Sequence, residues 1–66
     1  MEIADVKKNL NKMVLFSLYD TEKEWLFVGC TLRKRGAEYY SQAELKETKA
    51  NAVIIARLED IKPIGG

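Results

Sequence analysis

Two runs of alternating apolar and polar residues, 25–34 and 37–46, meet at the dipeptide Arg35-Gly36. Strand side chains alternate between two faces, so this pattern predicts a β-hairpin that turns at Arg35-Gly36. Pairing outward from the turn places one face toward a core: Leu32 opposite Tyr39, Cys30 opposite Ser41, Val28 opposite Ala43, and Leu26 opposite Leu45.

The other face of this hairpin is polar and is expected to meet solvent. An ion pair between Arg33 and Glu38 would reinforce the register. The remaining pairs on this face are Thr31 with Tyr40, Gly29 with Gln42, Phe27 with Glu44, and Trp25 with Lys46.

The residues before this hairpin predict a helix and a first strand. Ile3, Val6 and Leu10 recur at helical spacing, which predicts an amphipathic helix over residues 3–12, with Asn11 as a left-handed cap. Apolar residues then dominate positions 13–19, and a polar break predicts a hairpin loop at 21–23. The inward side chains of this strand are Val14, Phe16 and Leu18.

After a connection at residues 48–51, the pattern resumes, and we expect Ile54 opposite Leu45 and Ala56 opposite Ala43. Leu58 lies beyond these pairs on the same face.

Residues 58–64 predict a single turn and a short edge strand, where a proline does little harm to the ladder. Four to five antiparallel strands in meander order, with a bend at Gly29, favour a mainly β fold: a small SH3-like antiparallel barrel. The chain then forms one domain, 1–66, with a barrel or meander over 13–64 after the short N-terminal helix.

A helical alternative exists for residues 41–50, because Ser41 and Glu44 have the spacing of a capping box. Such a helix would bury little beyond Ala43 and Leu45, whereas a strand finds a partner at every position. We therefore favour the strand and keep the helix as the alternative.

Composition indicates a folded domain with little catalytic inventory. Of the 66 residues, 47% are hydrophobic and 32% charged, and a core of this size is marginal alone, so a protein partner or homodimer is expected. The chain has no histidine and one cysteine, which argues against zinc sites and histidine-dependent triads. We expect no enzyme activity, cofactor, metal or small-molecule substrate, and expect Cys30 to be a small core residue.

The net charge of +1 provides no global field for a polyanion. Neither a signal peptide nor an apolar run of membrane-spanning length is visible, so we expect a cytoplasmic protein without membrane contact.

Several apolar side chains point away from the predicted core. Trp25, Phe27 and Tyr40 could supply a binding or homodimer face, unless the N-terminal helix and strand curvature bury them. The full set is Leu15, Tyr19, Trp25, Phe27, Tyr40, Val53 and Ile55.

The hairpin tip carries the dense basic cluster Arg33, Lys34 and Arg35, which makes nucleic acid an alternative partner. Glu38 can neutralise Arg33, and the helix lysines at 7, 8 and 12 would extend the cluster only if the helix lies near the tip.

Two resemblances add to this interpretation. The tail Pro63-Ile64-Gly65-Gly66 resembles that of ubiquitin-like sulfur carriers, which implies an alternative role as a sulfur or modifier carrier, although those proteins need a central helix. Over most of its length the chain also resembles small prophage-borne proteins of Gram-positive bacteria, which implies an accessory or regulatory role. The segments that carry this second resemblance are residues 4–9, 29–34, 39–45 and 57–61. We expect a non-enzymatic binding module.

Overall fold

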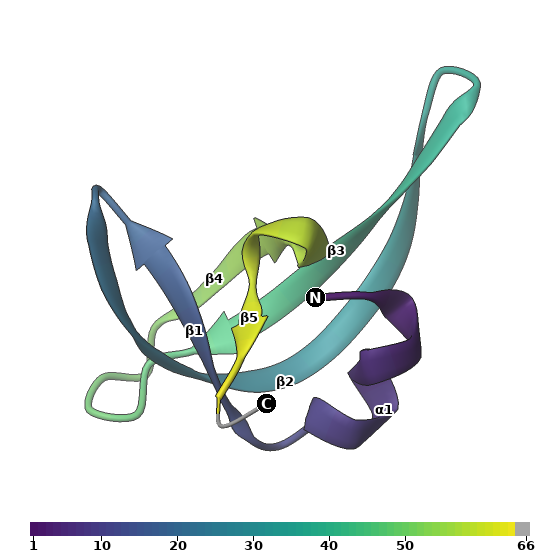
Figure 1. Ribbon diagram of the computed structural model, residues 1–66. Coiled ribbons are helices and arrows are strands. Elements are labelled where there is room, and N and C mark those ends of the chain that lie inside the picture. Colours follow the sequence, from purple (N-terminus) through teal and green to yellow (C-terminus); the bar gives the residue numbers. More distant parts are fainter. Residues whose placement is uncertain (65–66) are drawn as a thin grey trace.

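Five antiparallel strands form one sheet in the computed structural model, which describes residues 1–64 (Figure 1). The strands follow the order β4-β3-β2-β1-β5 across the sheet. Their bounds are β1 Met13–Leu18, β2 Thr21–Arg35, β3 Glu38–Lys46, β4 Val53–Arg57 and β5 Lys62–Pro63. A 3-10 turn, η2, spans Leu58–Asp60 before β5. The mainly β class, the five antiparallel strands and the short N-terminal helix are confirmed.

The N-terminal helical segment is shorter than residues 3–12 and begins as a 3-10 turn. It consists of η1, Ile3–Asp5, and α1, Val6–Asn9. Val6 and Leu10 pack against the core, whereas Ile3 is 70% exposed. Asn11 follows with a φ of 65°, the left-handed backbone predicted for it. The chain then enters β1 beside β2, because Asn11 N–H donates to the carbonyl of Phe27 at 2.7 Å.

The β1–β2 hairpin has a tighter loop than the predicted 21–23. Leu18 pairs with Thr21, so the loop is the dipeptide Tyr19-Asp20, and both residues have positive φ, 52° and 62°. Two positive φ values are the signature of a type I′ turn, which matches the right-handed twist of the strands. The inward face is as predicted, since Val14 is buried and Phe16 and Leu18 pack against the core.

Replacing this dipeptide by Asn-Gly should stabilise the protein. A non-glycine residue in the left-handed region costs roughly 1–2 kcal/mol, and Asn-Gly is the preferred type I′ pair. Tyr19 is 92% exposed, so Tyr19→Asn with Asp20→Gly sacrifices little contact. We expect the free energy of unfolding to rise by about 1–2 kcal/mol in urea titrations. Gly36→Ala is a control with the opposite expected effect. Gly36 has a φ of 62° and open space around it, so an alanine there should lower stability through backbone strain alone.

The central hairpin turns one residue later than predicted. Arg35 pairs with Glu38, so the loop is Gly36-Ala37, with positive φ only at the glycine, as in a type II′ turn. Each β2 residue near the tip therefore pairs with a β3 residue two positions further along the chain than predicted. Leu32, for example, pairs with Ser41 and not with Tyr39. The predicted Arg33–Glu38 pair is wrong for the same reason.

A β-bulge between Phe27 and Gly29 overturns the predicted core face of β2. Phe27 pairs with Leu45 and Gly29 with Glu44, so one extra residue of β2 sits between them and the alternation reverses. Trp25 and Phe27 are consequently buried, at 2% and 0% exposure, while Val28 is 36% exposed. Beyond the bulge β2 bends strongly, at the position where the sequence suggested a bend (Figure 1).

The strand prediction for residues 41–50 is confirmed over β3, and the helical alternative is wrong. Leu45 pairs with Ile54 and Ala43 with Ala56, as expected. β5 pairs with β1 through Val14 and Pro63, which makes it the expected edge strand after a single turn. Within residues 1–64 no ladder joins β4 to β5, so the sheet is open and closure into a barrel is not confirmed.

The hydrophobic core lies where the curved sheet and η2 meet. Its buried members come from β1 to β4, from η2 and from the residue before β5: Val14, Trp25, Phe27, Ala43, Leu45, Ala56, Leu58 and Ile61.

Candidate functional site

The β2–β3 hairpin continues beyond the strands on either side of it. β1 pairs with β2 only over residues 21–26, and β4 pairs with β3 only over 42–46. Residues 32–41 therefore form a two-stranded extension, called the ribbon below, which projects from the body of the molecule (Figure 1). Both of its edges carry backbone groups without a ladder partner in the described sheet.

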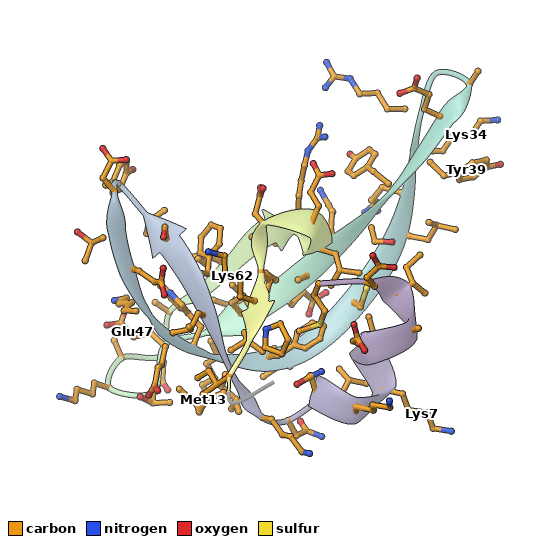
Figure 2. All side chains as sticks on the ribbon, in the orientation of Figure 1. Lys7, Met13, Lys34, Tyr39, Glu47 and Lys62 are labelled. Atoms are coloured by element: carbon orange, nitrogen blue, oxygen red, sulfur yellow. The ribbon has the colours of Figure 1, made fainter. Side chains whose placement is uncertain are left out.

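The inner face of the ribbon, which continues the core face of β3, exposes two large apolar side chains. Leu32 and Tyr39 are 62% and 64% exposed. The ammonium of Lys34, opposite Tyr39 in the register, lies 5.7 Å from the centroid of the tyrosine ring. Figure 2 shows Lys34 and Tyr39 together at the far end of the ribbon.

Two adjacent hollows open beside this inner face, and the first also reaches Tyr40 and Arg57 of the outer face; together the two hollows are called the groove. They share Ile3, Leu32 and Ser41, so the groove crosses the ribbon from the N-terminal helix to η2. The first hollow, of about 340 Å³, is completed by Met1, Tyr39, Tyr40, Arg57, Leu58 and Glu59. The second, of about 460 Å³, is completed by Val6, Lys7, Leu10 and Cys30.

The N-terminal amino group fixes the helical side of the groove. It donates hydrogen bonds to the carbonyls of Leu58, at 3.0 Å, and Ile61. These bonds fasten the first residues to η2 and hold Ile3 across from Leu32, where both line the two hollows.

The predicted basic tip lies on the ribbon and is exposed. Arg33 donates from Nε to Oε1 of Gln42 at 3.1 Å on the outer face, and Arg35 stands opposite Glu38. Tyr40, another predicted site residue, is half-buried, and the guanidinium of Arg57 lies 5.3 Å from the centroid of its ring. The structure therefore brings Tyr40 and the basic tip together on one extension.

Trp25 and Phe27, by contrast, cannot belong to a binding face, because the bulge turns both into the core. The ammonium of Lys23 lies 4.5 Å from the centroid of the Trp25 ring and covers it on the solvent side. The buried indole N–H of Trp25 has no acceptor among the described residues, a cost of about 1–3 kcal/mol.

The contribution of Leu32, Tyr39 and Ile3 to the site was not predicted from the sequence. Leu32 and Tyr39 alternate in phase with the core face, but they lie near the tip of the hairpin. β3 has nine residues, whereas the neighbouring strands β1 and β4 have six and five, so the hairpin extends beyond both. The difference in the lengths of the alternating runs could have shown from the sequence that the hairpin tip lacks neighbouring strands. Side chains beyond the reach of a third strand have nothing to pack against.

The prediction that Cys30 is a small core residue is wrong. Cys30 lies on the inner face opposite Ala43, but it is exposed and lines the second hollow instead of the core. Partial desolvation raises the pKa of its thiol above the ordinary value, which lowers the thiolate fraction at neutral pH and makes the side chain a weak nucleophile.

Among residues 1–64 no cluster of three or more cysteine or carboxylate side chains is placed to hold a metal ion. In the same part of the chain, no helix has the length and apolarity to cross a membrane. The glycines at 65 and 66, on which the carrier resemblance rests, lie outside the described residues.

Comparisons of the chain with protein families, with curated proteins and with solved structures find no match.

Proposed function

We propose that the protein is a non-enzymatic binding module and that the groove on the ribbon is its contact surface. The observation that carries this proposal is the exposure of Leu32 and Tyr39, more than 60% each, on the floor of a groove. Adjacent exposed apolar side chains in a hollow mark an interaction site.

The form of the ribbon supports the same proposal. A two-stranded hairpin without a third strand or an apolar cover is marginally stable in water. A partner that covers Leu32 and Tyr39 would supply the missing apolar contact and order the extension. A binding role thus accounts for both the projecting strands and the composition of their inner face.

Nucleic-acid binding is the second candidate function. Tyr39 beside Lys34, with Arg33 and Arg35 on the same extension, combines a ring on which a base can stack with cations that can reach phosphates. A homodimer, a prophage-borne accessory role and a cytoplasmic location remain predictions from the sequence.

Affinity purification with matched surface variants tests the binding role. The groove variant is Leu32→Ser with Tyr39→Ser, and the control is Val53→Ser with Ile55→Ser, at 57% and 60% exposure on the outer face. Loss of one apolar anchor weakens binding by 1 kcal/mol or more at hot spots, so the groove variant should lose its partners. The control variant should retain every protein or nucleic acid that the parent retains. Partners kept by the groove variant and lost by the control would place the contact surface elsewhere.

A further inference from the structure

The groove has an aliphatic floor and a basic rim. Ile3 and Leu32 line both hollows, and Val6 and Leu10 extend the apolar surface toward the helix. Cations stand around it: Lys7 lines the second hollow, Arg57 the first, and Lys34 rises beside Tyr39. In Figure 2, Lys7 marks the helical end of this surface and Lys34 the end of the ribbon.

Two of these cations form no ion pair in the described structure. Arg57 contacts Glu59 at 3.6 Å, which offsets its charge. The ammonium groups of Lys7 and Lys34 have no carboxylate within 4.0 Å among residues 1–64. The rim therefore carries positive charge that a ligand with carboxylates would complement.

The floor argues against single-stranded nucleic acid as the preferred occupant. Proteins that bind single strands stack successive bases on several aromatic side chains. In the described part of this groove, Tyr39 has an exposed ring, while Tyr40 is half-buried beneath Arg57. The rest of the floor is aliphatic, which suits apolar side chains of a polypeptide.

The rim argues against a symmetric contact of the groove with a second copy. A two-fold interface brings the same patch of both copies together. Lys7 and Lys34 of one copy would then approach the same basic rim of the other, and like charges brought together disfavour association.

We propose that the groove binds an acidic peptide segment that places an apolar side chain in each of the two hollows. This inference rests on the proposed binding role and names its ligand class. The carboxylates of the peptide would lie near Lys7 and Lys34, and its apolar side chains would cover Leu32 and Ile3.

Selection from a displayed library of short random peptides on the immobilised protein tests the ligand class. The parent should enrich peptides that combine an excess of Asp and Glu with apolar residues. Lys7→Glu with Lys34→Glu reverses the charge of the rim at two exposed positions, and this variant should enrich peptides with Lys and Arg instead.

The dissociation constant of the best selected peptide is then measured for the parent and for each variant. We expect Leu32→Ser to weaken binding by about tenfold or more, the usual effect of removing an apolar anchor. Val53→Ser, a matched control on the outer face, should leave the dissociation constant within about twofold. Circular dichroism of each variant verifies that the fold is retained, and the exposure of all four substituted side chains favours this.

Three results would overturn the inference about the ligand class, and a fourth would also refute the proposed function. The first is enrichment of peptides without acidic excess, or of the same peptides by the parent and the charge-reversed variant. The second is tighter binding of a thymidine-only single-stranded oligonucleotide than of any selected peptide, and the third is a dimer in sedimentation that Leu32→Ser dissociates. The second and third results would refute the acidic peptide but leave the groove as the contact surface, whereas binding insensitive to Leu32→Ser would refute both proposals.

Discussion

Phe27→Ala is expected to lower the free energy of unfolding by about 3–5 kcal/mol, the usual cost of deleting a buried phenylalanine ring. Phe27 is fully buried opposite Leu45 in the core. Small domains are stable by only about 5–15 kcal/mol, so this variant should unfold near the start of a urea titration. The fluorescence of Trp25, which is 2% exposed in the folded chain, follows the transition.

Val28→Ala is the matched control for this experiment. Val28 is the next residue, but the bulge leaves it 36% exposed, so its truncation should cost about 0.5 kcal/mol. An uninterrupted strand alternation would reverse the order, with Val28 inside and Phe27 outside. A larger loss for Val28→Ala than for Phe27→Ala would therefore contradict the bulge, and Phe27→Leu provides a milder variant if the alanine variant does not fold.

Ile61→Ala is expected to destabilise the fold by about 2–5 kcal/mol, although Ile61 adjoins a strand of only two residues. Ile61 is 1% exposed, its N–H donates to the carbonyl of Leu58 at 3.2 Å, and its own carbonyl accepts from the N-terminal ammonium. Ile61 thus links three elements next to β5: its backbone binds η2 and the N-terminal ammonium, and its side chain packs in the core.

Urea titration and amide hydrogen exchange in β1 measure this effect. Ile64→Ala is the control, because Ile64 follows β5 and is 41% exposed. Consecutive strand N–H groups point to opposite neighbours, and Pro63, the partner of Val14, has no N–H, so loosening of β5 should speed exchange at Leu15 in the Ile61 variant alone. Equal losses of stability for the two variants would show that Ile61 has no special anchoring role.

Periodicity predicted the meander from β1 to β4, because each of these strands pairs with the next one along the chain. The pairs Leu45 with Ile54 and Ala43 with Ala56, and the inward Val14, followed from period-2 alternation and from local turn residues. These are contacts between sequence neighbours, for which alternation and loop length are sufficient information.

Alternation failed at the bulge, because the sequence predicted a bend at Gly29 but not the extra residue inserted beside it. Both faces of β2 carry apolar residues around Gly29, so a strand with Leu26 and Val28 inside and one with Trp25 and Phe27 inside look equally apolar. The larger buried area of two aromatic rings decides between them, since burial scales with apolar surface. Trp25 and Phe27 are therefore buried and do not form the predicted aromatic binding face.

The candidate site could be predicted only in part for a related reason. The basic tip is visible in the sequence, because Arg33, Lys34 and Arg35 are contiguous. The groove also needs Ile3, which reaches Leu32 only because the N-terminal ammonium binds carbonyls of residues 58 and 61. That contact joins residues 57 and 60 positions apart, and no local pattern reports it.

The pairing of β1 with β5 has a consequence for folding kinetics. The hairpins β1–β2, β2–β3 and β3–β4 each join adjacent segments, and such hairpins form in roughly 1–10 μs. Val14 and Pro63 can pair only when the long chain segment between them forms a closed loop. The conformational entropy of that segment is lost before the pairing contributes any stability. Collapse of the meander should therefore precede docking of the two chain ends.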